Sequence, residues 1–272
     1  MIDSRPAVHL ESEEVGVFNR RFGVRLRDES RVEAVLYRGD TLCISSQVGC
    51  AVRCPFCASG AKGLGRSLSL EELQGQVEAV GRVHELQRIT ISGVGEPLHN
   101  PATVDFLTWA RDRRLKVSLT TSGGPLSRLR AWLHRPHNGL TISVHSGQEE
   151  TRRRLVPKGP SLADLEALLA EEVPRLTRRR KKKTALAYLL LRGENDAATE
   201  LDAFAHRALP LGLSVHLYAF NPVATSEMER ATREAYEAAY ARLVAAGLRV
   251  RMSSKARVEA NGGCGTLVAL RT

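Results

Sequence analysis

Three cysteines lie within eight residues of a chain that contains only five. They are Cys50, Cys54 and Cys57 in the stretch CAVRCPFC, so their spacing is C-x3-C-x2-C. Thiolates bind iron–sulfur clusters, and a four-iron cluster normally takes four of them. Three local ligands would leave one iron with an open coordination position, where a substrate can bind and be polarised. The spacing therefore favours an iron–sulfur cluster with a catalytic role.

Other interpretations of these cysteines remain open. A zinc ion could be held by the three thiols together with Cys43 or a histidine, or the three could be unrelated structural thiols. Taken singly, Cys43 and Cys264 would be interpreted as small packing residues. The odd cysteine count, and a start (MIDSRPAVHL) without a charged segment followed by an apolar run, indicate a reducing cytoplasm.

The composition is that of a basic protein with enough apolar residues for a large core. Of 272 residues, 43% are hydrophobic, and 40 Lys and Arg against 30 Asp and Glu give a net charge of +10. Such a balance favours polyanions, RNA above all, through phosphate contacts. The alternative is a basic proteome without any nucleic-acid partner. No run of about 18 apolar residues occurs in this sequence, so no membrane span is expected.

The elements that would position the cysteines alternate between strands and helices from residue 41 onward. Ser69 with Glu72, and Ser161 with Asp164, have the spacing of helix caps. Strands are predicted at 41–46, 88–93, 115–123, 139–147, 184–193 and 213–222, with a last extended segment at 248–254. Helices are predicted at 69–86, 101–113, 125–133, 161–173, 196–209 and 226–246. Six such units in one run predict an α/β fold, a partial (β/α)6 barrel, with its chemistry at the carboxyl ends of the strands.

The segments outside this pattern are an N-terminal stretch and one basic run. Residues 1–40 alternate apolar and polar positions, which predicts a small antiparallel β extension ahead of a barrel domain at 41–272. The run RRRKKK at 178–183 lies between a predicted helix and a strand. We expect it to be a solvated loop, and the alternative is a contact with RNA phosphates.

The motifs together resemble a known family. With Phe56 just before Cys57, the cysteine motif resembles the radical S-adenosylmethionine (SAM) signature. The segments ISSQVGCAVRCPFCASG, GLGRSLSLEELQGQV, ISGVGEPLHN, LTTSG, ISVHS, FNP and GGCGTL occur in the order of the RlmN/Cfr family of RNA adenine methyltransferases, over residues 31–270. The resemblance implies a radical SAM barrel, one [4Fe–4S] cluster on Cys50, Cys54 and Cys57, and two SAM molecules per turnover.

The resemblance also implies roles for the other two cysteines. Cys264, in GGCGTL, matches the cysteine that the first SAM methylates; a 5′-deoxyadenosyl radical from the second SAM then takes hydrogen from the S-methyl group, and the carbon adds to adenine. Cys43 matches the cysteine that resolves the adduct through a transient disulfide with Cys264. Glu33, in RVEAVLY, matches the proton acceptor, because removal of a ring proton needs a base. The segment between Glu33 and Cys43 is shorter than in the family.

SAM contacts follow from the same resemblance. The matching positions are Gly95, Glu96, Thr120, Ser143, Val144, His145 and Asn221. The glycine would let the backbone approach SAM, and the Glu96 carboxylate would receive its ammonium group. The sequence departs from the family in having SGV before GEP, and a threonine where serine is common. For His145 taken alone, a hydrogen-bonded histidine at a strand end is the alternative.

The implied activity is methylation of an adenine ring carbon in rRNA or tRNA, at carbon 2 in preference to carbon 8 because that activity is commoner in the family. We expect a cytoplasmic monomer served by an electron donor such as flavodoxin or ferredoxin. Family members typically carry a helical RNA-binding domain ahead of the barrel; only 32 residues precede Glu33, so we expect a short form. The alternatives are a radical SAM enzyme that modifies a small molecule or peptide, and a zinc-stapled RNA-binding module.

Overall fold

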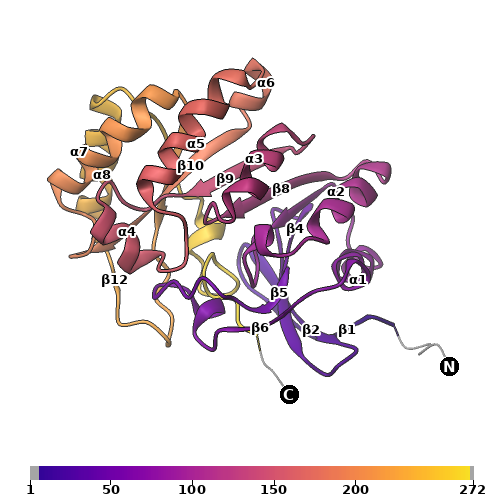
Figure 1. The fold of residues 1–272 in the computed structure, drawn as a ribbon. Coiled ribbons are helices and arrows are strands. Elements are labelled where there is room, and N and C mark those ends of the chain that lie inside the picture. The colour runs from indigo at the N-terminus through magenta and orange to yellow at the C-terminus, as the bar shows by residue number, and fades with distance from the viewer. Residues whose placement is uncertain (1–5, 270–272) are drawn as a thin grey trace.

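One continuous mixed sheet organises the protein, in a computed structural model that describes residues 6–269. The strand order is β1-β2-β3-β4-β7-β8-β9-β10-β11-β13, with β12 beside β10 and a separate β5–β6 hairpin. Helices cover the sheet, and the C-terminal segment lies at the centre of the molecule beside the loop that contains the cysteines (Figure 1). Within the described residues the outer strands β1 and β13 do not pair, so the sheet is an open, partial barrel.

The parallel part of the sheet confirms the six predicted strand–helix units. Its seven strands are β4 (Thr41–Ile44), β7 (Arg88–Ile91), β8 (Lys116–Thr121), β9 (Gly139–Ser143), β10 (Thr184–Arg192), β11 (Ser214–Ala219) and β13 (Arg249–Met252). The helices are α1 (Leu70–Gly81), α2 (Thr103–Asp112), α3 (Leu126–His134), α4 (Glu149–Leu155), α5 (Leu162–Arg175), α6 (Arg178–Lys181), α7 (Ala198–Ala208) and α8 (Arg233–Ala245). No helix within residues 6–269 combines the length and apolar character needed to cross a bilayer.

The N-terminal β extension is antiparallel, as the alternation predicts, and it continues the main sheet. It consists of β1 (Val8–Val15), β2 (Asn19–Leu26) and β3 (Arg31–Tyr37). Strand β3 pairs antiparallel with β4, and Val35 lies opposite Cys43 in this register. The extension therefore forms one wall beside the first barrel strand.

Several local elements differ from the sequence-based expectation. The helix predicted at 226–246 begins only at Arg233, because Thr232 caps it by accepting a hydrogen bond from the Ala235 amide. The residues before it form β12 (Glu229–Arg230), which pairs with the end of β10. The first four residues of the basic run form the short helix α6 rather than a loop. Elements without a prediction are α4, the hairpin strands β5 (Gln47–Gly49) and β6 (Leu64–Ser67), and the 3₁₀ turns η1 (Ala58–Gly60), η2 (Pro97–His99), η3 (Leu209–Leu211) and η4 (Lys255–Val258).

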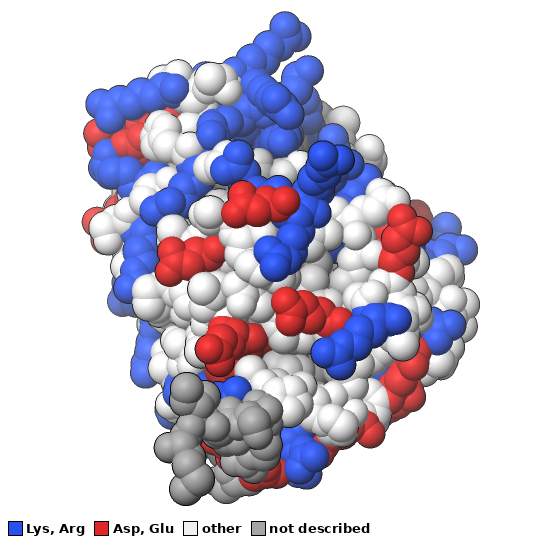
Figure 2. All heavy atoms as spheres, turned by 90° about the vertical axis from the view of Figure 1, so that its right-hand side faces the viewer, with Lys and Arg blue, Asp and Glu red and all other residues white. Residues whose placement is uncertain are grey.

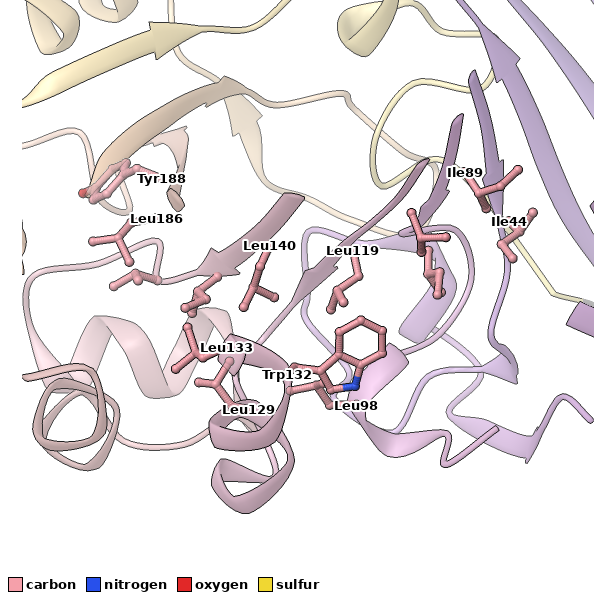
Figure 3. Close-up of a cluster of buried hydrophobic side chains, with 14 of the residues drawn as sticks. Ile44, Ile89, Leu98, Leu119, Leu129, Trp132, Leu133, Leu140, Leu186 and Tyr188 are labelled. Atoms are coloured by element: carbon pink, nitrogen blue, oxygen red, sulfur yellow. The ribbon is translucent and has the colours of Figure 1, made fainter. Parts of the chain in front are cut away.

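The core that holds the strands in place is a layer of aliphatic side chains between the sheet and its helices. Figure 3 shows Ile44, Ile89, Leu119 and Leu140, one from each of four adjacent parallel strands, on the side of Trp132 in α3. All five side chains are at most 1% exposed. Because parallel strands covered by helices must be apolar, this layer fixes where each strand ends and where its following loop begins.

Helix α1, which follows the cysteine loop, has the predicted capping box. Ser69 Oγ accepts from the Glu72 amide at 3.2 Å, and Glu72 Oε2 accepts from the Ser69 amide at 2.8 Å. Ser69→Ala leaves the Glu72 amide without its partner, so we expect it to lower the free energy of unfolding by about 1 kcal/mol. Urea denaturation measures this loss. Ser127→Ala, at an exposed position of α3, is the control, and an equal loss there would contradict the capping explanation.

Candidate active site

The cysteine loop is closed at its base by the β5–β6 hairpin. Gly49 has φ +81°, and a Cβ there would lie 1.9 Å from the Gly63 carbonyl oxygen, so only glycine fits. The Cys50 amide donates to the same carbonyl at 3.1 Å. This close approach of two backbone segments brings the three thiols back over the carboxyl ends of the strands, where the fold class predicts chemistry.

The three thiols face a common space and influence one another. Burial raises the pKa of Cys50 to about 12, and the Cys57 sulfur adds to the shift. Burial also raises the pKa of Cys54 well above its usual range, and the Cys57 and Cys50 sulfurs raise it further. Three thiols crowded in this way can all become thiolates only when a positively charged group lies between them. Within residues 6–269, no three His, Cys, Asp or Glu side chains are placed to share a single metal ion.

A buried arginine supplies positive charge beside these thiols. Arg152 is 1% exposed, and its guanidinium donates to the carbonyls of Ser143 (2.5 Å), Val144 (3.0 Å) and Ser122 (2.7 Å). Burial lowers its pKa to about 10, and the Cys54 sulfur opposes this shift. The three converging thiols and this buried cation fit a negatively charged [4Fe–4S]–thiolate group.

The cavity above the thiols also collects most of the predicted SAM-binding residues. We call it the loop cavity; it has an empty volume of about 610 Å³. Its lining includes Cys50, Cys54, Cys57, Gly95, Glu96, Thr120, Ser143 and His145. Cluster ligands and SAM contacts, predicted from distant parts of the sequence, therefore lie around one space. That arrangement fits SAM bound beside a cluster.

Glu96 is fixed rigidly in this cavity. Its Oε1 accepts from the Leu98 amide (3.0 Å) and Thr121 Oγ1 (2.5 Å), and its Oε2 accepts from the Ser122 amide (2.7 Å). Oε2 has one acceptor direction left for an ammonium group. The preceding Gly95 has φ +107°, and a Cβ there would lie 2.6 Å from the Gln47 side chain. The glycine thus permits the turn that aims the carboxylate.

His145 is held neutral with a defined orientation. Its Nδ1 accepts from the Leu189 amide at 3.0 Å, which leaves the proton on Nε2. Burial, and then the positive charge of Arg152, lower its pKa to about 3. The Phe56 ring packs edge-on at 5.4 Å between centroids. His145 can therefore present a neutral N–H donor to a cofactor, which is more than the simple strand-end role of the alternative.

Two predicted SAM contacts lie elsewhere. The Val144 side chain is 7% exposed and packs in the apolar core near Leu165, so only its backbone faces the other predicted residues. Asn221 Nδ2 donates to the carbonyls of Arg257 (2.7 Å) and Cys264 (3.0 Å). The structure thus places Asn221 as a clamp on the segment that contains Cys264.

Cys43 and Cys264 line one pocket. This cysteine-pair pocket has an empty volume of about 540 Å³ and is also lined by Val35 and Tyr37 of β3. Cys43 Sγ lies 3.2 Å from Ser92 Oγ, and burial raises the Cys43 pKa to about 11. Ser92 and Cys57 line both this pocket and the loop cavity, so the two spaces are contiguous. Cys43 therefore belongs with Cys264 rather than with the three clustered cysteines.

Arg257 holds Cys264 at the junction of the cavities. Its Nη1 donates to Cys264 Sγ at 3.0 Å, and its carbonyl accepts from the Cys264 amide at 3.1 Å. The guanidinium stacks on Tyr218, 4.7 Å from the ring centroid. The Cys264 sulfur is the largest cause of a raised Arg257 pKa. A third space, the central cavity, contains Cys264, His145 and Tyr218 together, so Cys264 borders both the SAM-side residues and Cys43.

Glu33 does not itself line these cavities, but it is two residues from one that does. It is on the same face of β3 as Val35, which lines the cysteine-pair pocket. Its Oε2 accepts from the Val268 amide at 2.8 Å, and Oε1 lies 3.5 Å from Arg21 Nη1. Burial raises the Glu33 pKa, and the hydrogen bond and Arg21 oppose that shift. A carboxyl group whose pKa is raised by burial suits a base.

Four residues of the site have no sequence-based prediction: Ser92, Arg152, Tyr218 and Arg257. Arg152 is the first of three consecutive arginines, and only the fold shows that it alone of them is buried. Arg257 lies in the short 3₁₀ turn η4, seven residues before Cys264, and a single turn is too short for periodicity to carry information. The one signal in the sequence was the presence of a cation, Arg257, close to the predicted nucleophile Cys264.

Comparisons with known proteins agree with this geometry. The radical SAM superfamily matches residues 44–208. A probable RNA methyltransferase of Chromobacterium violaceum is 31% identical over 256 residues, which are 92% of this chain and 72% of the relative. The dual-specificity RNA methyltransferase RlmN of Sorangium cellulosum is 34% identical over 247 residues, 85% of this chain and 62% of that protein. The crystal structure of a radical SAM methyltransferase from Sphaerobacter thermophilus has a TM-score of 0.86 at 26% identity, covering 96% of this chain and 81% of that one.

The fold, the cysteine loop and the contiguous cavities define a SAM-dependent methyltransferase of the radical SAM type. A radical SAM enzyme contains a [4Fe–4S] cluster and uses SAM. Within that class, the chain belongs to the RlmN/Cfr-like family of RNA methyltransferases.

Proposed function

We propose that this protein methylates a ring carbon of an adenine in RNA, by way of a methyl group carried on Cys264. The observation that supports this most directly is the shared pocket of Cys264 and Cys43, which adjoins the loop cavity through Cys57 and Ser92. An adenine ring carbon is not nucleophilic, so a direct attack on SAM has no good pathway. Two thiols beside a radical centre provide a covalent alternative.

The residues of the loop cavity bind and orient SAM. When bound, the cluster and SAM supply the abstraction of a hydrogen atom from a methyl group. The Glu96 carboxylate offers an acceptor to the SAM ammonium group, and His145 offers a neutral donor. Arg257 keeps the Cys264 sulfur at the border of the same space.

The thiols and Glu33 perform the transfer. Cys264 Sγ takes a methyl group from SAM, and after hydrogen abstraction that carbon bonds to the adenine ring. The ring loses one proton to Glu33 and one electron to the redox chain of a flavodoxin or ferredoxin. Cys43 Sγ then attacks Cys264 Sγ: the S–S bond forms, the S–C bond breaks, and its electron pair goes to the methyl carbon, which takes a proton.

The finer assignments belong to the same proposal. We propose an adenine of rRNA or tRNA as the target, carbon 2 in preference to carbon 8, and two SAM molecules per turnover. The relatives' names support RNA as the substrate class. We further propose that residues 1–40 act as a β extension to a catalytic domain at 41–272, in a monomer in the cytoplasm.

The test of this function is a trapped intermediate. Cys43→Ala protein lacks the resolving thiol, so turnover with SAM, a reductant and total cellular RNA should leave the RNA bonded to Cys264. After nuclease digestion, mass spectrometry of the Cys264 peptide should show a methylene-linked adenosine. The double variant Cys43→Ala/Cys264→Ala is the control and should carry nothing. A Cys264 peptide that carries an adduct other than a nucleoside would rule out RNA as the substrate.

A further inference from the structure

Positive charge gathers at the end of the sheet where β8, β9 and β10 begin. Lys and Arg cover most of the upper end of the molecule in Figure 2, at the height where α6 lies in Figure 1. The segments 111–116, 135–138 and 178–183 contain eleven Lys and Arg residues in sixteen positions. We call this set the basic edge: Arg111, Arg113, Arg114, Lys116, Arg135, Arg178, Arg179, Arg180, Lys181, Lys182 and Lys183.

Contacts join the three segments into one surface. The Arg180 guanidinium donates to the Arg135 carbonyl, which links α6 to the turn before β9. The Leu140 amide of β9 donates to the Lys183 carbonyl at 2.8 Å. The Asn138 amide donates to the Val117 carbonyl at 2.6 Å, which links the same turn to the start of β8. Neighbouring strands are about 5 Å apart, so the three basic segments lie side by side.

Little negative charge balances this surface. The three segments contain one acidic residue, Asp112. The carboxylates of α5 nearest in sequence to α6, Glu171 and Glu172, already pair with Arg130 and Arg175. Like charges held close together raise the free energy of the folded protein unless anions screen them.

The crowding of cations is visible in two neighbouring groups. His137 is buried, with only 3% of its surface exposed. Burial, and then Arg180 and Lys183, lower its pKa to about 4. Burial, and then Arg179 and Arg180, lower the Lys183 pKa. An anion at this surface would relieve the repulsion between Lys183 and the neighbouring Arg179 and Arg180.

Helix dipoles account for only part of this charge. Cations are favourable in the last turn of a helix, which explains Arg111 at the end of α2. All four residues of α6 are basic, however, and two more lysines follow before β10. A helix of one turn has only a small dipole, which cannot account for six consecutive cations. Such a run favours association with a polyanion.

The basic edge lies away from the cavities, at the opposite ends of the strands. Leu189 lines the central cavity five residues after Thr184, which is about 16 Å along β10. Helix α6 precedes Thr184 and is farther away still. At about 3.4 Å per nucleotide, this distance alone corresponds to about five nucleotides, so one RNA would need more than that number to reach both regions.

We propose that the basic edge binds phosphates of the RNA substrate at a distance from the target adenine. This inference rests on the proposed function, because it takes RNA as the substrate. Phosphate contacts position a nucleic acid without reading its sequence. The basic edge would thus hold a large, folded RNA while its target adenine reaches Cys264.

The test compares long and short RNA on matched charge variants. Arg179→Gln/Lys182→Gln removes two charges from exposed positions of the basic edge. The control, Arg233→Gln/Arg242→Gln, removes two exposed charges from α8. Fluorescence anisotropy is recorded over a series of salt concentrations, with a labelled RNA hairpin of about 40 nucleotides and a labelled RNA of about four nucleotides.

For the hairpin, we expect the first variant to weaken affinity at about 0.1 M salt by roughly tenfold or more, and to reduce the slope of log Kd against log salt concentration by about two. Binding of the four-nucleotide RNA should stay unchanged in both variants. Unchanged hairpin binding, or an equal loss in the α8 control, would overturn the proposal. The proposal would also be overturned if Arg179→Gln/Lys182→Gln protein lost binding to anionic lipid vesicles but still bound the hairpin like the wild type. The partner of the basic edge would then be a membrane surface.

The outcome is separable from that of the proposed function, since binding is measured without turnover. Hairpin binding that depends on the basic edge, in a protein that methylates no RNA, would reject the methylation proposal and leave the docking surface standing. RNA methylation with hairpin binding indifferent to the two substitutions would reject only the docking surface.

Discussion

Cys264→Ser protein is expected to lose methylation of RNA by at least about a thousandfold while it continues to cleave SAM reductively. A hydroxyl is a far weaker nucleophile than a thiol toward the SAM methyl group, so the carrier is never loaded. The cluster cysteines and Glu96 lie in the loop cavity, outside the segment that is changed. Mass spectrometry of the same reaction gives both quantities, methylated adenosine and 5′-deoxyadenosine.

The matched control is Cys50→Ser, which removes one of the three clustered thiols. This variant should lose SAM cleavage as well as methylation, together with the broad visible absorbance of an iron–sulfur protein. The pair of variants therefore separates the thiol that carries carbon from the thiols that hold the cluster. RNA methylation by Cys264→Ser protein at a rate near that of the wild type would remove Cys264 from the pathway.

The second large effect is expected at Glu33. Glu33→Gln should lower kcat by about a hundredfold to ten-thousandfold, because an amide cannot take the ring proton. Only the carboxylate form is a base, so activity should rise with pH through the pKa of Glu33. Burial raises that pKa, which places the rise at higher pH than for an ordinary glutamate. The rise should be absent in the residual activity of Glu33→Gln protein.

Two neighbours move this pH dependence in opposite directions. The cation of Arg21 lowers the Glu33 pKa, so Arg21→Gln should shift the rise to higher pH. The charge of Glu14 raises the Glu33 pKa, so Glu14→Gln should shift it to lower pH. The measurement is kcat against pH for wild type and both variants. Superimposable profiles would show that Glu33 is not the titrating base.

The sequence was informative where a local pattern has a local cause. Alternation and apolar periodicity predict the six strand–helix units, and Ser69 with Glu72 predicts the start of α1. The predicted start of α8 is wrong by several residues, because Thr232 caps the helix and residues 229–230 pair with β10 instead. Boundaries of this kind depend on tertiary pairing that no window of sequence contains.

The same division applies to the site. The family resemblance predicts the three clustered cysteines, five of the other residues that line the loop cavity, and the two cysteines of the pair. The sequence does not show that Val144 turns into the core, or that Asn221 clamps the Cys264 segment, because both outcomes depend on which side of a strand end each residue occupies. Arg152 and Arg257 escape prediction for a related reason: a charged residue reveals its importance only through burial.

Strand β4 is hydrogen-bonded to β3 on one side and to β7 on the other, with Cys43 opposite Val35 and Thr90. A strand that is paired on both sides cannot shift without breaking the hydrogen bonds to both neighbours. The backbone at Cys43 is therefore held in place. Cys264 lies outside the strands, and side-chain hydrogen bonds from Arg257 and Asn221 hold its segment. Because the proposed disulfide requires the two sulfurs to approach within about 2.05 Å, we expect the Cys264 segment to make most of that movement. We therefore expect the breaking of the Arg257 and Asn221 hydrogen bonds to Cys264 to limit the rate of turnover.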